Sequence, residues 1–257
     1  MSKPQYQNKS VRKALRLLSV FGRDKQELSL TDLARELDML PGSMYAIITP
    51  LQDAGYLMRD PQTKRYRLGM EFLGKANCVL SGLDLREQAK PELRELTKAV
   101  SANSYLGIIY GETVLYLDRE EAHPSRSGLS NAAIGYRDHL HATALGKVLT
   151  AFNDEIREQL LECESLEAIT IQTITDPLTL RRELDIVRQR GYAIDREESQ
   201  LGDVCIAAPV YDFEGQVTAA VSIAVTKTRF DHESVNATAA IVMDTAARIS
   251  ARMGYPG

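Results

Sequence analysis

Hydrophobic and polar positions in the N-terminal quarter of the chain follow first a helical and then a strand-like period. In SVRKALRLLSVF, apolar residues recur at helical spacing, and Ser10 is expected to be the N-cap. LTDLAREL and MYAIITPLQDAG repeat this spacing on either side of a break at Pro41 and Gly42. YLMRDPQTKRYRL then alternates as a hairpin that turns at Asp60 and Pro61. The residues expected to face the core from the first helix are Val11, Ala14, Leu15, Leu18 and Phe21.

The predicted order of a helix, a helix-turn-helix and a basic β-wing is typical of winged DNA-binding domains. Charge supports this interpretation, because residues 1–77 contain 13 Lys and Arg against 8 Asp and Glu. The rest of the chain contains 18 basic and 27 acidic residues, although the whole chain carries a net charge of only −4. A basic N-terminal domain (residues 1–69) is therefore expected to bind the phosphates of double-stranded DNA.

The pattern after the wing predicts two further parts. GMEFLGKANCVLSG is helical and lies between the two charge regimes, so residues 70–82 are predicted to form a linker helix. Residues 83–257 then alternate between strands and helices, with a polar loop of about 15 residues near position 130 that is long enough to suggest a function. Consecutive strands joined by short turns predict an α+β C-terminal domain (residues 83–257) around a mostly antiparallel sheet.

Composition excludes several other classes of protein. No apolar run approaches the ~18 residues that span a bilayer, and MSKPQYQNKS has no apolar signal-peptide core. The three cysteines, Cys78, Cys163 and Cys205, are too widely spaced for a disulfide framework or a zinc motif. We therefore expect a cytoplasmic protein with reduced thiols and no membrane partner.

Several segments, in the same order, resemble the IclR family of bacterial transcriptional regulators. The N-terminal matches are SVRKALRLLSVF, LSLTDLARELDMLPGSMYAIITPLQDAGYLMRD and KRYRLG, and the C-terminal ones are LHATALGKVLTAF, ITDPLTLRRELDIVRQRGYAIDREES and GDVCIAAPVYDFEGQVTAAVSIAV. The resemblance covers nearly the whole chain. It implies a winged helix-turn-helix and a GAF-like effector-binding domain. It also implies a homodimer or tetramer on a pseudo-palindromic operator, with a ligand that alters the DNA complex.

Position in the winged domain indicates which side chains reach DNA. The third helix is expected in the major groove, with the wing and the first helix at phosphates. Residues 41–58 contain no Lys or Arg, unlike related helices, and Pro50 interrupts the predicted recognition helix. DNA affinity could come from the wing and first helix, or the domain could bind DNA weakly. The DNA-binding candidates are Arg12, Ser43, Tyr45, Ala46, Thr49, Lys64, Arg65 and Arg67.

The resemblance also implies an effector site at one end of the sheet, roofed by the polar loop. The first turn of the helix ATALGK offers backbone N–H groups and a positive dipole end, which suit the carboxylate of a small organic or aromatic acid. Asp203 could instead bind a hydroxyl or amine, or weaken carboxylate binding. Cys205, Ser222 and Ala224 could also be ordinary sheet packing, and Asp195 and Asp203 could be strand-end or turn residues. The effector-binding candidates are Ser127, Ser130, Ala144, Leu145, Asp195, Asp203, Cys205, Ser222 and Ala224.

Two other chemistries are weaker hypotheses. His139 and His141 lie near Asp138, so a metal site is conceivable, but neither HExxH nor CxxC occurs. Cys205 could be a nucleophile, yet CIAAPV is too apolar to activate a thiolate. We expect no enzyme activity, no metal and no cofactor. The alternative function is a metabolite-binding module with weakened or lost DNA binding. The effector, the operator, the target genes and the sign of regulation do not follow from the sequence.

Overall fold

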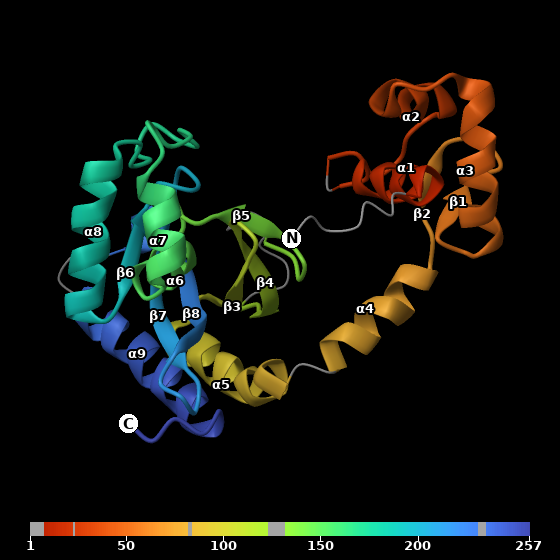
Figure 1. Ribbon diagram of the computed structural model, residues 1–257. Helices are drawn as coiled ribbons and strands as arrows, with labels where there is room; N and C mark the ends of the chain where they lie inside the picture. The colour runs from red at the N-terminus through yellow and green to blue at the C-terminus, as the bar shows by residue number, and fades with distance from the viewer. Residues whose placement is uncertain (1–7, 23, 82–83, 123–131, 231–234) are drawn as a thin grey trace, which may run out of the picture. The chain divides into compact units, whose positions relative to one another are not determined.

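The computed structural model describes residues 8–22, 24–81, 84–122, 132–230 and 235–257 of the 257-residue chain. The chain divides into two compact units, Met1–Gly82 and Leu83–Gly257 (Figure 1). No helix in the described part of the chain is long and apolar enough to cross a membrane.

The N-terminal unit begins with three helices that pack around one apolar core. Their bounds are α1 (Lys9–Ser19), α2 (Leu30–Leu37) and α3 (Pro41–Asp53). The two wing strands, β1 (Leu57–Arg59) and β2 (Tyr66–Leu68), pair antiparallel, and α4 (Glu71–Ser81) follows them. The fully buried side chains in this core come from all three helices and both strands, which explains why the short elements hold together. They include Leu17, Leu33, Met44, Ile48, Leu57 and Tyr66.

One expectation for the first helix was wrong, and another was confirmed only in part. The N-cap is Asn8, whose side chain accepts hydrogen bonds from the backbone N–H groups of Ser10 and Val11. The predicted core face is correct in part: Ala14, Leu18 and Phe21 pack against the core, but Leu17 is the fully buried residue, and Val11 and Leu15 are more than half exposed. Several helical phases fit a segment this rich in apolar residues, and tertiary packing selects among them.

The C-terminal unit is built on a six-stranded sheet in the order β5-β4-β3-β8-β7-β6, in which every neighbouring pair is antiparallel. This confirms the predicted α+β class. The strands are β3 (Asn103–Tyr110), β4 (Thr113–Glu120), β5 (Arg137–His139), β6 (Ala193–Arg196), β7 (Asp203–Tyr211) and β8 (Val217–Thr226). The helices are α5 (Asp84–Val100), α6 (Ala144–Ala151), α7 (Asp154–Leu161), α8 (Pro177–Arg190) and α9 (Val235–Arg252), with a 3₁₀ turn at Lys227–Arg229.

Helices cover both faces of this sheet (Figure 1). The face against α5 and α9 is called the α9 face, and the face against α6, α7 and α8 is called the α6 face. Strand alternation sends successive side chains to opposite layers. On β8, for example, Val221 and Ile223 join the core of the α9 face, whereas Ala220 and Ala224 join the core of the α6 face. The central strands are therefore apolar on both sides, as their near-continuous hydrophobic sequence requires.

Candidate functional site

The predicted recognition helix exposes the predicted DNA-facing residues. In a helix such as α3, residues three or four apart share one side, so buried positions recur at that spacing and the positions between them face solvent. Met44, Ile47 and Ile48 are buried. The exposed positions are Ser43, Tyr45, Ala46 and Thr49. The four candidates therefore share the solvent side of one helix.

Pro50 does not end this helix, which continues to Asp53. Its ring nitrogen cannot donate to the carbonyl of Ala46, so α3 lacks one interior hydrogen bond. Gly55, with a φ of +74°, follows the helix and donates to the carbonyl of Gln52, as a C-terminal glycine does. The predicted recognition helix, α3, thus runs from Pro41 to Asp53 and contains no Lys or Arg.

The wing turn is held by its own side chains. The Asp60 carboxylate accepts hydrogen bonds from the N–H groups of Gln62 at 2.8 Å and Thr63 at 2.7 Å. Arg59 donates to the carbonyl of Lys64 at 3.2 Å, and its guanidinium lies 5.4 Å from the centre of the Tyr66 ring. These contacts give the wing a defined shape. The predicted DNA-binding cations of the wing are exposed, as is Arg59 on β1; they are Lys64, Arg65 and Arg67. Arg12 is exposed on α1.

Strand register brings most of the predicted effector residues together on the α6 face. Asp195 on β6 lies opposite Cys205 on β7, which lies opposite Ala224 on β8. Ser222 is two residues before Ala224 and therefore points to the same face. Asp203 is two residues before Cys205 and has the same orientation. Cys205 is partly exposed and the other four residues are buried, so these side chains form one neighbourhood below α6.

The first turn of α6 is fixed against the chain that precedes it. Thr143 is the N-cap, and its hydroxyl accepts from the N–H of Gly146 at 3.0 Å. A Cβ atom at Gly146 would lie 2.4 Å from the carbonyl oxygen of Leu140, so only glycine permits this approach. The first N–H groups of a helix have no intrahelical partner. Since Thr143 takes the N–H of Gly146, the donors that suit an anion are those of Ala144 and Leu145.

Asp195 has a second task, because it organises the turn after β6. Its carboxylate accepts from the N–H groups of Glu198 at 2.7 Å and Ser199 at 3.3 Å, and from the Ser199 hydroxyl at 2.5 Å. Burial outweighs these hydrogen bonds and raises the pKa of Asp195 to about 6. Asp195 therefore has a structural role in addition to the effector-binding role predicted for it.

The environment of Cys205 disfavours nucleophilic chemistry. Burial, together with the neighbouring carboxylates of Asp195 and Asp203, raises the pKa of the Cys205 thiol well above its usual value. A reactive cysteine requires the opposite shift, because the thiolate is the nucleophile. Cys205 is accordingly suited to packing against a ligand.

The histidine pair has partners that do not require a metal. The rings of His139 and His141 lie 5.7 Å apart in an edge-to-face arrangement. His141 Nε2 lies 2.8 Å from the carbonyl oxygen of Glu167, and burial lowers the pKa of His141. No group of three or more metal-ligating side chains occurs among the residues described. The predicted loop residues Ser127 and Ser130 lie outside those residues.

The sequence interpretation missed four buried polar side chains near the predicted effector residues. Tyr105 on β3 lies opposite Ser222 on β8, and its ring packs edge-to-face on Tyr116 with centres 5.6 Å apart. Lys147 on α6 is fully buried and pairs with Glu198 at 2.6 Å. Strand alternation could have placed the tyrosines once the strand order was known. Nothing in the sequence distinguishes Lys147 from a surface lysine.

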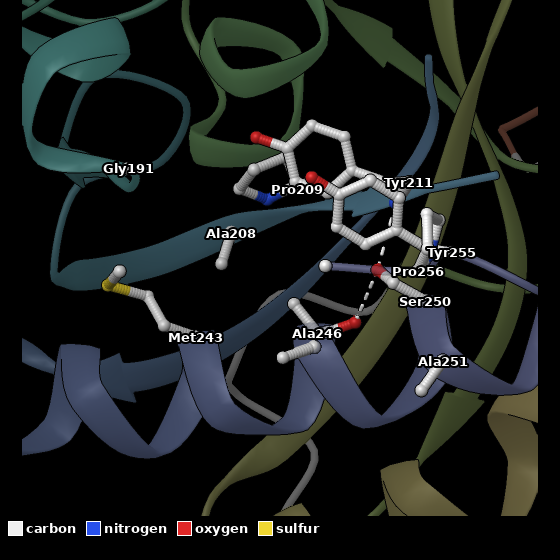
Figure 2. Close-up of a pocket in the computed structure, with 12 residues that line it drawn as sticks. Gly191, Ala208, Pro209, Tyr211, Met243, Ala246, Ser250, Ala251, Tyr255 and Pro256 are labelled. Atoms are coloured by element: carbon white, nitrogen blue, oxygen red, sulfur yellow. Dashed lines mark hydrogen bonds between the residues drawn. The ribbon is translucent and has the colours of Figure 1, made fainter. Parts of the chain in front are cut away.

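A separate cavity lies on the α9 face, between β7 and α9 (Figure 2). Its volume is about 390 Å³. Tyr211 and Tyr255 stack at one side with ring centres 4.9 Å apart. Ser250 donates to the carbonyl of Ala246 and accepts from the N–H of Tyr211, so its hydroxyl is used within the fold. Since the sheet separates this cavity from Asp195 and Cys205, it is not the predicted effector site.

Comparison with known proteins supports the same two-part organisation. The IclR helix-turn-helix domain family matches residues 10–61, and the family described as bacterial transcriptional regulator IclR C-terminal matches residues 77–251. The HTH-type transcriptional regulator XynR of Escherichia coli is 31% identical over 96% of this chain and 98% of its own length.

Two solved structures extend the likeness to the fold. The Thermotoga maritima IclR superposes with a TM-score of 0.76 at 28% identity, covering 96% of this chain and 99% of its own. An IclR homolog from Microbacterium hydrocarbonoxydans, complexed with 4-hydroxybenzoate, gives a TM-score of 0.82 at 26% identity over 95% and 98%. The chain belongs to the IclR family of bacterial transcriptional regulators.

Proposed function

We propose that this chain is a cytoplasmic, ligand-responsive and sequence-specific regulator of a catabolic operon. The N-terminal domain binds operator half-sites through α3 and the wing, and the chain acts as a homodimer or tetramer. The C-terminal domain binds a small organic or aromatic acid. Binding shifts the population between arrangements that differ in DNA affinity.

The observation that carries the effector proposal is the strand register on the α6 face. Cys205, Ser222 and Ala224 share the sheet face that α6 covers, and the first turn of that helix offers backbone N–H groups that suit a carboxylate. The Ser222 hydroxyl adds one hydrogen-bonding group. The homolog that binds 4-hydroxybenzoate supports an acid of this size.

The DNA proposal rests on the exposed side of α3 and the ordered basic wing. Hydrogen bonds from uncharged side chains can read base edges, while wing cations supply the salt-dependent affinity. A second function has one observation in its favour: α3 contains no cation and carries Pro50 in its interior. On that basis the alternative is a metabolite-binding module with weakened DNA binding.

One experiment separates these two functions. A random duplex library is selected with the full chain, and binding to the enriched duplex is measured by fluorescence anisotropy. The regulator function predicts an enriched sequence whose affinity changes when small organic acids, 4-hydroxybenzoate among them, are added. Failure to enrich any sequence, combined with thermal stabilisation by an acid, would favour the binding module. Ser222→Ala should weaken the acid response without changing affinity for the duplex.

A further inference from the structure

The start of α2 is attached to the wing through the main chain. Leu28 and Tyr66 exchange two backbone hydrogen bonds, of 3.0 and 2.7 Å, so the residue before the α2 N-cap lies beside β2. Arg65 immediately precedes β2. Backbone pairing therefore brings the first turn of α2 within reach of the Arg65 side chain.

Asp32 occupies this first turn and carries the charge that faces the wing. It forms a capping box with Ser29: the Ser29 N–H donates to the Asp32 carboxylate at 3.2 Å, and the Asp32 N–H donates to the Ser29 hydroxyl at 3.1 Å. Arg35 donates to Asp32 Oδ1 at 3.0 Å. The other oxygen, Oδ2, lies 3.7 Å from Nη2 of Arg65.

The three wing cations predicted to contact DNA, Lys64, Arg65 and Arg67, are not equivalent. Arg65 is the one whose side chain has a carboxylate within 4.0 Å among the described residues, and that carboxylate belongs to Asp32. The hydrogen bonds from Ser29 lower the pKa of Asp32, which keeps it ionised at neutral pH. A guanidinium beside a carboxylate presents less net charge to a phosphate than Lys64 or Arg67 does.

We propose that Asp32 is a positioning residue that holds Arg65 against α2 and thereby limits sequence-independent binding of the wing to DNA phosphates. This inference rests on the wing–DNA contact proposed above. It gives Asp32 a role beyond helix capping. A regulator must find its operator among many competing sites, so tighter binding to non-specific DNA lowers the ratio of operator affinity to non-specific affinity.

The test uses the full chain and a labelled duplex of arbitrary sequence, about two helical turns long. Asp32→Gln removes the charge, and Asp32→Glu keeps it. Both side chains are favourable at this position of a capping box, so the two variants differ chiefly in charge. Glu36→Gln is the matched control, because Glu36 lies one turn later on α2 and pairs with Lys25 at 2.6 Å instead of with the wing.

We expect Asp32→Gln to bind about 2- to 5-fold more tightly than Glu36→Gln near 0.1 M salt, the range that corresponds to one exposed ion pair. Asp32→Glu should bind like the original chain. In a double-mutant cycle, Arg65→Gln should weaken binding more in the Asp32→Gln background than alone. Equal affinities of the Asp32→Gln and Glu36→Gln variants would overturn the proposal. An equal effect of Arg65→Gln in both backgrounds would also overturn it.

A third outcome separates this inference from the proposed function. If Arg65→Gln has no effect in either background while Lys64→Gln and Arg67→Gln still weaken binding, the wing contacts DNA without Arg65. The role of Asp32 is then wrong and the DNA proposal stands. If none of the three wing substitutions changes affinity, the wing–DNA contact itself is wrong. Thermal unfolding of each variant shows whether α2 remains folded.

Discussion

The ammonium group of Lys147 lies 2.6 Å from a carboxylate oxygen of Glu198, and both side chains are buried. Lys147 also donates to the carbonyl of Ile194, while the second carboxylate oxygen of Glu198 has no hydrogen-bond partner among the described atoms. The pair joins α6 to the turn that follows β6. It therefore ties two elements of the candidate site to each other.

Removing one member of this pair should destabilise the C-terminal domain strongly. Lys147→Ala is expected to lower the free energy of unfolding by about 3–5 kcal/mol, because it leaves a buried carboxylate without its cation. Urea denaturation measures the change. Lys98→Ala is the control, since Lys98 forms an exposed pair with Glu95 at 2.8 Å and should change stability by less than about 1 kcal/mol. A loss below about 1 kcal/mol for Lys147→Ala would contradict the buried-pair account.

Asp195 should make stability fall as the pH rises through the mildly acidic range. Its pKa of about 6 in the folded chain lies above the ordinary 3.8. Between these values the folded state binds more protons than the unfolded state, so acidification stabilises the fold and deprotonation removes that stabilisation. From pH 5 to pH 7 the loss is about 1 kcal/mol. In urea denaturation at pH 5 and pH 7, Asp195→Asn should not show this loss of stability. The same pH dependence in the variant and the original chain would contradict the role of Asp195.

Pro50 should cost the recognition helix stability. Pro50→Ala supplies the missing N–H to the carbonyl of Ala46, so the unfolding free energy of the N-terminal unit should rise by about 1–3 kcal/mol. Pro41 is the matched control, because it is in the first turn of the same helix, where proline is favourable. Thermal unfolding of both variants measures the change, and Pro41→Ala should not raise the unfolding free energy. A loss of stability in Pro50→Ala would show that the ring has a packing role.

Much of this arrangement could be predicted from the sequence, and the exceptions have physical reasons. Strong hydrophobic periodicity and clear stop signals identified α2, α3, α8 and the wing, because helix caps and turns depend on residues that are neighbours in the sequence. In α1 the prediction missed Leu17 and included the exposed Leu15, since both are equally apolar and only tertiary contacts decide which of them is buried. Lys147 was missed because buried lysines are rare. Tyr105 was missed because the sequence of a strand does not show which other strands pair with it.

The linker helix should be needed for the ligand response but not for ligand binding. Replacing α4 (residues 71–81) with a flexible Gly/Ser segment removes the predicted linker helix, so the states of the two units should become independent. The affinity of the C-terminal domain for an active acid, measured by calorimetry, should persist. The effect of that acid on the selected duplex should disappear. A preserved effect would mean that coupling takes another route.

The salt dependence of DNA binding tests the central claim most directly. The association constant of the full chain for the selected duplex is measured as salt rises, for the original chain and for Arg67→Gln. We predict a linear fall of log K with log salt and a slope that is shallower by about 0.9 for each phosphate contact that the substitution removes. A flat dependence, or the same slope in both proteins, would contradict binding through the cationic wing.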